Sequence, residues 1–296
     1  MSSSGSNDVR MNGWRSLLAP MLVLLIVIAI WQGVVIVWRI HPILLPSPVL
    51  CRLDAKEWSP EMAKLTKEFP YNSVLKAGWK IRGDLLTGSL RTAAAAGAGL
   101  GLSTVAGVLL AFLFSQSKLI RRALYPYAVL LQTIPIIAIA PIVIVAFGRG
   151  FFSVSLVAAV ISLFPIVTST TTGLLQIDSN LLDLFRLNGA TRWQTLMKLR
   201  VPSSLPFLIS GIRIASGSAI VGAIVGEFFV GSSQPGLGSM IQTKANSALD
   251  MSELYATVLT STVLGTVSFA SVTMIGETIL RRWFAMSLDG QGNGTR

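Results

Sequence analysis

Long apolar segments alternate with shorter polar ones along the 296 residues of the chain. Each apolar segment has about 20 residues, the length that a helix needs to cross the hydrocarbon core of a bilayer. The predicted spans cover residues 17–38, 90–114, 125–147, 151–174, 207–230 and 254–279. This pattern predicts an all-α polytopic membrane protein with six transmembrane helices.

Two of the predicted spans have a composition that is typical of packed helices. Span 125–147 contains Pro126, Pro135 and Pro141, and proline inside a helix frees backbone carbonyls and bends the axis. We therefore expect a broken, packed helix there. Span 90–114 is rich in Ala and Gly. Its Gly97 and Gly101 would permit close contact with another helix, although such a pair often arises by chance in this kind of span.

The spans divide the chain into tails, a loop and a core. We expect an N-terminal tail at 1–16, a long loop at 39–89, a five-span core at 90–282 and a C-terminal tail at 283–296. In the loop, Ser59-Pro60-Glu61 has the pattern of a helix start. Residues 73–86 have amphipathic spacing, which suits either a helix on the bilayer surface or a solvated helical loop.

The polar stretch 178–206 interrupts the core between the fourth and fifth spans. Its pattern predicts two short helices that are broken at Gly189. The expected caps are Asp178 or Ser179 for the first helix and Thr191, with Gln194 completing a capping box, for the second. The apolar side of the pair consists of Leu182, Phe185, Leu196 and Leu199. A short amphipathic helix pair beside a membrane is suited to docking on a partner.

Charge supports the membrane assignment and orients the chain. Only 12% of the residues are charged, against about 25% in soluble domains. The net charge of +11 fits membrane orientation better than nucleic-acid binding, because the basic residues lie mainly between the spans. On the side of the termini lie Arg10, Arg15, Lys118, Arg121, Arg122, Arg186, Arg192, Lys198, Arg200, Arg281, Arg282 and Arg296. The positive-inside rule therefore places both termini, a basic loop at 115–123 and the stretch 178–206 in the cytoplasm.

Residues that could support catalysis are missing from the sequence. It contains no GxxxxGK[ST] phosphate loop, no HExxH and no CxxC motif. The single cysteine, Cys51, and the single histidine, His41, form neither an internal disulfide nor a metal pair. Paired carboxylates and a Ser/His constellation are also missing. We therefore expect no enzymatic activity, no metal and no cofactor in this chain.

Charged residues inside the predicted spans are few. Glu277 is expected to pair locally with Arg281, Glu227 to reach water near a span end, and Arg213 to snorkel or pair near the cytoplasmic face. Ion-driven transporters usually carry intramembrane ionisable relays. A transport protein without such a relay, but with a cytoplasmic docking element, suggests a partner that supplies the energy. An ion-driven secondary transporter or channel remains the alternative, and a membrane scaffold or enzyme a third.

The docking stretch resembles the signature of the permease subunits of ABC importers. That signature is Glu-Ala-Ala, three residues, Gly, nine residues, Ile, one residue and Leu-Pro. Here Asp183-Leu184-Phe185 stands in the place of Glu-Ala-Ala, and Gly189 matches the glycine of the signature. Leu199 replaces Ile, and Val201-Pro202 replaces Leu-Pro. Leu184 and Phe185 are bulkier than the alanines of the signature.

Further segments resemble one branch of that family, the nitrate/sulfonate/taurine-type permeases. These are LLPSP (44–48), TGSLRTAAAAGAGL (87–100), QTIPIIAIAPIVIVAFGRG (132–150) and GIRIASGSAIVGAIVGEFFVGSSQPGLG (211–238). The resemblance covers about 17–282, and the region 49–88 is longer than is usual for the branch.

The resemblance implies a type I ABC importer permease in the cytoplasmic (inner) membrane of a bacterium. Two permease chains, here expected as a homodimer, would form the pore, and two ATPase subunits would carry ATP and Mg²⁺ on the cytoplasmic face. An extracytoplasmic binding protein would deliver a small anion (nitrate, a sulfonate such as taurine, or bicarbonate) or a vitamin precursor. The ATPase-docking residues would be Asp183, Arg186, Gly189, Ala190, Arg192, Trp193 and Pro202. Weaker candidates for the translocation path are Gln132, Thr133, Ser216 and Ser218.

Overall fold

A computed structural model describes residues 8–38, 40, 44–49, 73–230, 235–247 and 250–284. Every regular element in these ranges is a helix, which confirms the predicted all-α class. The helices are α1 (Asp8–Val37), α3 (Val74–Lys80), α4 (Arg82–Gln116), α5 (Lys118–Thr133), α6 (Ile136–Phe147), α7 (Phe151–Leu175), α8 (Ser179–Leu187), α9 (Arg192–Thr195), α10 (Val201–Val230), α11 (Leu237–Ala245) and α12 (Met251–Phe284). A π-helical segment, η2 (Leu196–Arg200), joins α9 to α10.

Four of the described helices are long and apolar enough to cross a membrane: Arg82–Gln116, Phe151–Leu175, Arg192–Val230 and Met251–Arg282. Met21–Val37 and Ile137–Phe147 are shorter apolar helices. These six segments correspond in order to the six predicted spans. The third predicted span is broken, as expected, at Ile134 and Pro135 between α5 and α6.

Several boundaries differ from the predicted ones. The expected basic loop at 115–123 is largely helical, because the Ser117 side chain caps α5 at Leu119 and Ile120 and places Lys118 in its first turn. Helix α4 begins at Arg82, inside the expected loop 39–89. Residues 73–86 are largely helical, with Leu75 and Trp79 exposed on α3 and Val74 and Ala77 buried, and the amphipathic surface helix stays a prediction. The helix start expected at Ser59 lies outside the described residues.

The chain forms two compact units. The first contains residues 1–82 and 243–257, and its charged centre is Glu253, which pairs with Lys80 at 3.1 Å and also with Lys244. In the same unit, Trp31 packs against Tyr255 with ring centroids 5.7 Å apart. The second unit contains residues 83–242 and 258–296 and holds the docking stretch.

The core of the second unit is the close packing of α7 against α4 and α10. Ala158 on α7 is fully buried, and it lies against a glycine on each neighbour. A Cβ at Gly99 would come within 2.7 Å of the Ala158 Cβ, and a Cβ at Gly222 would come within 2.8 Å of the Ala158 Cα. The close approach of α4 therefore depends on Gly99. At the expected pair, Gly97 and Gly101, an added Cβ would meet no atom of the described residues within 4 Å.

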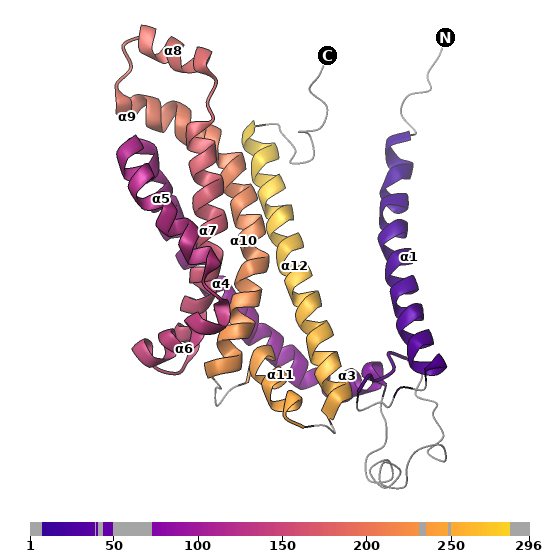
Figure 1. Ribbon diagram of the computed structural model, residues 1–296. Helices are drawn as coiled ribbons and strands as arrows, with labels where there is room; N and C mark the ends of the chain where they lie inside the picture. Colours follow the sequence, from indigo (N-terminus) through magenta and orange to yellow (C-terminus); the bar gives the residue numbers. More distant parts are fainter. Residues whose placement is uncertain are drawn as a thin grey trace, which may run out of the picture. The chain divides into compact units, whose positions relative to one another are not determined.

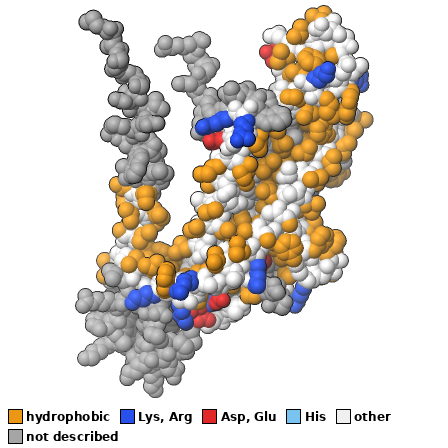
Figure 2. Space-filling view, turned by 180° about the vertical axis from the view of Figure 1, so that it is seen from behind, with side chains coloured by type: hydrophobic (Ala, Val, Ile, Leu, Met, Phe, Trp, Pro, Cys, Tyr) orange, Lys and Arg blue, Asp and Glu red, His pale blue; other side chains and the backbone are white. Residues whose placement is uncertain are grey.

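The ends of the second unit differ in what they carry. Figure 1 shows α8 and α9 at the same end as the C-terminal end of α12, with α6 at the opposite end. Figure 2 shows hydrophobic side chains along the lengths of the long helices and Lys and Arg side chains near their ends. This distribution is the one expected for helices that cross a bilayer.

Candidate coupling site

The two short helices of the docking stretch begin where the sequence predicts. The Asp178 side chain accepts a hydrogen bond from the Asn180 N–H at 2.9 Å and caps α8. At α9, the Thr191 hydroxyl accepts from the Gln194 N–H and the Gln194 side chain accepts from the Thr191 N–H, at 3.2 and 2.8 Å. This reciprocal pair is the predicted capping box.

Gly189 turns the chain between the two helices. Its φ of +68° lies in the left-handed region. The Gly189 N–H donates to the Arg186 carbonyl and the Ala190 N–H donates to the Phe185 carbonyl, both at 3.0 Å. These two bonds form a Schellman motif, which satisfies carbonyls at the end of α8. Because a Cβ here would meet nothing within 4 Å, glycine is required by the backbone conformation and not by space.

The second helix continues into the fifth span through the π-helical segment η2. The Val201 N–H donates to the Leu196 carbonyl, five residues back. Pro202 follows at once. It has no N–H to donate, and its ring crowds the carbonyl of Lys198, four residues back. The π turn lies directly before Pro202, where the α-helical bond to the Lys198 carbonyl cannot form. The predicted start of the fifth span at Phe207 is therefore too late.

The helix pair has an inner and an outer apolar surface. Leu196 and Leu199 are buried, and Leu182 and Phe185 are half-buried, as predicted. We call the exposed apolar side chains of this segment the outer surface, of which Leu187 is exposed by 87% and Trp193 by 66%; its members are Leu181, Leu184, Leu187, Trp193 and Met197. The sequence predicts only Trp193 among these as a site residue. Exposed apolar side chains at short helices are typical of contact surfaces.

Both short helices carry charged residues of the site. Arg186 pairs with Asp183 at 2.9 Å, one turn apart on α8. Arg192 and Pro202 are exposed and Ala190 is half-buried. A cavity of about 490 Å³ lies behind the pair, between α8, α9, η2 and the end of α4. Thus four of the seven predicted docking residues lie on α8 and α9, Gly189 and Ala190 lie in the turn between them, and Pro202 lies at the start of α10.

The predicted translocation residues are dispersed. Thr133 is exposed at the end of α5 and donates to the Leu130 carbonyl at 2.8 Å. On α10, Ser216 donates to the Arg213 carbonyl at 2.7 Å and Ser218 to the Ile214 carbonyl at 3.4 Å. Ser216 also lines a cavity of about 200 Å³ between α4, α10 and α12. The Gln132 side chain lies outside the described residues.

Two of the three intramembrane charges have local partners. Glu277 lies 3.7 Å from Arg281, as predicted. The Arg213 guanidinium lies over the Phe269 ring, 5.5 Å from its centre, and its buried Nε has no hydrogen-bond acceptor among the described residues. Arg213 therefore makes a cation–π contact with α12.

Contrary to the prediction, the Glu227 side chain does not reach water. It is 8% exposed, and its carboxyl group accepts the Thr92 hydroxyl at 2.9 Å and the Gly238 N–H at 2.8 Å. The Thr92 Oγ1 in turn accepts the Leu237 N–H at 3.0 Å. This group, the Glu227 network, joins α4, α10 and the start of α11. A buried carboxyl group is stable only when such donors surround it.

Long apolar helices and an exposed, capped helix pair define a polytopic membrane protein with two short helices at one end of its second unit. The chain belongs to the family of binding-protein-dependent transport system inner membrane components, which its residues 103–284 match. Members of this family are the membrane-embedded, non-catalytic permease subunits of ABC importers, so the family predicted from the sequence is confirmed.

Relatives of the chain have diverse solutes in their names. The chain is 37% identical over 185 residues to the formylaminopyrimidine transport permease ThiX of Halalkalibacterium halodurans, a match that covers 62% of this chain and 72% of the relative. It is 34% identical over 171 residues to the riboflavin permease RibX of Chloroflexus aurantiacus, covering 56% and 60%. A longer match, 28% identical over 270 residues, covers 91% of this chain and 88% of the putative aliphatic sulfonate permease SsuC of Bacillus subtilis.

Proposed function

We propose that this chain forms the membrane pathway of an ATP-driven importer and that a separate ATPase docks on the coupling site. The observation that carries the proposal is the helix pair around Gly189, capped at both starts and exposing apolar side chains. ATP and Mg²⁺ would be bound by the ATPase, and this chain would bind neither. Movement of the docked ATPase would pass through α9 and η2 into α10, because these segments form one continuous helix from Arg192 to Val230.

The coupling site faces the cytoplasm in this proposal. At the end of the second unit that carries α8 and α9 lie Lys118, Arg121 and Arg122 at the start of α5 and Arg281 and Arg282 at the end of α12. Cytoplasmic ends of spans are enriched in Lys and Arg. The tails 1–16 and 283–296 would then be cytoplasmic, and the region 39–89 would lie on the outer face of the inner membrane.

The complete importer would contain two copies of this permease and two ATPase subunits. A binding protein on the outer face would deliver the solute. The names of the relatives include formylaminopyrimidine, riboflavin, aliphatic sulfonates and nitrate. The solute of this importer would be a small anion, such as nitrate, bicarbonate, taurine or another sulfonate, or a vitamin precursor. Gln132, Thr133, Ser216 and Ser218 are the candidates for polar groups along its path.

Uptake into proteoliposomes tests this function. The permease, its ATPase and its binding protein should together import the binding protein's ligand only when ATP is inside. Omitting the ATPase should reduce uptake to the level of empty liposomes. Uptake that persists without the ATPase and follows an imposed ion gradient would instead favour an ion-driven secondary transporter or channel.

Trp193 provides a more local prediction. Interface tryptophans often contribute about 2 kcal/mol or more, so Trp193→Ala should weaken ATPase binding to the permease about 10- to 100-fold. The change would be measured by titrating labelled ATPase onto the permease in nanodiscs. Trp79→Ala is the matched control, because Trp79 is 71% exposed but lies on α3, in the first unit. Unchanged affinity of the Trp193→Ala variant would contradict a docking role for Trp193.

A further inference from the structure

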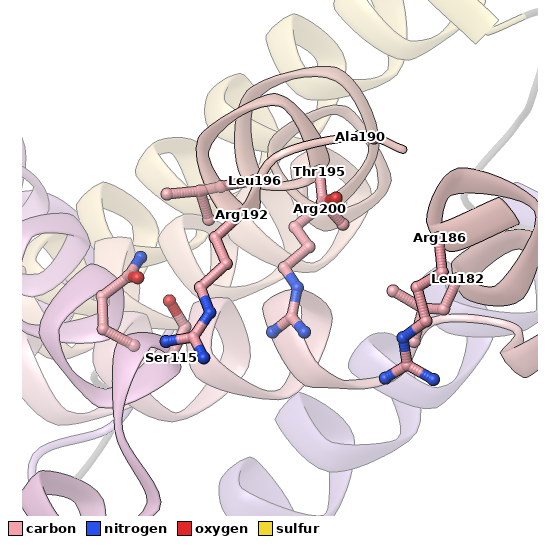
Figure 3. Close-up of a pocket in the computed structure, with 9 residues that line it drawn as sticks. Ser115, Leu182, Arg186, Ala190, Arg192, Thr195, Leu196 and Arg200 are labelled. Carbon is pink, nitrogen blue, oxygen red and sulfur yellow. The ribbon is translucent and has the colours of Figure 1, made fainter. Parts of the chain in front are cut away.

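The cavity behind the coupling site has a strongly basic lining. Arg186 comes from α8, Arg192 from α9 and Arg200 from η2, while Ser115 and Gln116 come from the last turn of α4. Figure 3 shows Arg192 and Arg200 extending in the same direction into the cavity, with Arg186 entering from α8. The fold thus brings to one space residues that are up to 85 positions apart in the sequence, since Ser115 and Arg200 both line it.

The positive charge of this cavity is only partly compensated. None of the described residues that line it is acidic. Arg186 has Asp183 at 2.9 Å, on the exposed side of α8. For Arg192 and Arg200, the described part of the chain contains no carboxylate within ion-pair distance. Guanidinium groups that face one space repel one another. An anion between them would be attracted to each group and would outweigh this repulsion.

We propose that this cavity binds an oxyanion of the phosphate or sulfate type. The guanidinium group is planar and presents parallel N–H donors that match two oxygens of such an anion. The Ser115 and Thr195 hydroxyls and the Gln116 amide line the same space and offer neutral donors. The volume of about 490 Å³ accommodates either a free hydrated anion or the headgroup of an anionic lipid.

Occupancy would regulate the coupling site, a consequence that rests on the function proposed above. An anion held between Arg192 and Ser115 would tie the second coupling helix to the end of α4. Among the described residues, the apolar packing next to this helix is the cluster of Leu196 on η2 with Ala111 on α4 and Leu174 on α7. A bound oxyanion should therefore stiffen the link between the ATPase and the spans.

Binding can be measured on the full permease chain alone, so the result does not depend on the proposed transport function. Thermal unfolding in a neutral detergent would be followed by tryptophan fluorescence while phosphate replaces chloride at constant ionic strength. We expect a saturable rise of about 2–4 °C in the midpoint. Arg200→Gln and the more exposed Arg192→Gln should each weaken the apparent phosphate affinity at least about tenfold.

The matched control is Lys198→Gln, which removes the same charge from the same segment but lies outside the cavity lining. It should keep the wild-type response. A response that is absent from wild type, or equal in Arg200→Gln, Arg192→Gln and wild type, would overturn the proposal.

Nanodiscs distinguish the two sources of the oxyanion. If a lipid headgroup fills the site, the phosphate response should disappear when phosphatidylglycerol is added to a phosphatidylcholine bilayer, and it should persist if the site takes a free anion. A response seen in the isolated chain but lost on addition of the ATPase would overturn the regulatory role, because the ATPase would then occupy the cavity in place of the anion.

Discussion

Replacing Gly189 with proline should abolish ATP-driven uptake while the chain still enters the membrane. Proline holds φ near −65°, whereas Gly189 has a φ of +68°. Proline also removes the N–H that donates to the Arg186 carbonyl. The turn between α8 and α9 would therefore change direction, and the exposed apolar side chains of the two helices would lose their present arrangement.

A graded series at Gly189 separates backbone conformation from bulk. An L-residue in the left-handed region costs about 1–2 kcal/mol, and asparagine is tolerated better than most. Because the space around the position is open, uptake should fall in the order Gly, Asn, Ala, Val, Pro. Abundance in the membrane fraction should stay constant through the series.

Gly83→Ala is the control for the glycine series. Gly83 also has open space around its Cβ position, but it lies in α4 without a positive φ. Alanine there should leave uptake unchanged. Normal uptake by Gly189→Pro would contradict the coupling role of the turn.

Replacing Glu227 with alanine should strongly destabilise the second unit. The change leaves the Thr92 hydroxyl and the Gly238 N–H buried without their acceptor, and each such loss costs about 1–3 kcal/mol. Unfolding of the purified permease should shift by several degrees, and uptake should fall with it. Gly238→Ala should act in the same direction, because a Cβ there would lie 2.1 Å from the Ile224 carbonyl oxygen.

The matched control for this prediction is Glu277→Ala. Glu277 is also a glutamate in a predicted span, but its partner Arg281 is 68% exposed and the two lie 3.7 Å apart. Exposed ion pairs contribute about 0–1 kcal/mol, so the unfolding midpoint should change little. Equal shifts for the Glu227 and Glu277 variants would show that the Glu227 network adds no special stability.

The features that sequence predicts well are those decided by neighbours along the chain. Span existence follows from runs of apolar residues. The caps at Asp178 and Thr191 follow from side chains that reach backbone groups two or three residues away. The break at Gly189 and the break before Pro135 follow from backbone rules that apply to glycine and proline in any fold.

The features that sequence misses depend on contacts between distant segments. Glu227 is expected to reach water because it lies near a span end. Its burial depends on Thr92 and Gly238, which lie 135 and 11 residues away along the chain. The glycine at which α4 approaches α7 is Gly99, and not the expected pair Gly97 and Gly101, for the same reason. Its identity depends on where Ala158 of α7 lies.

The sequence by itself determined the class of this protein, its apolar spans and the helix pair around Gly189, because each depends on hydrophobicity or on local backbone hydrogen bonds. Only the tertiary structure decided which surface of that pair is exposed, how η2 joins it to α10, and that Arg186, Arg192 and Arg200 share one cavity. Those features depend on which helices pack together, and a periodic apolar pattern does not specify its packing partner.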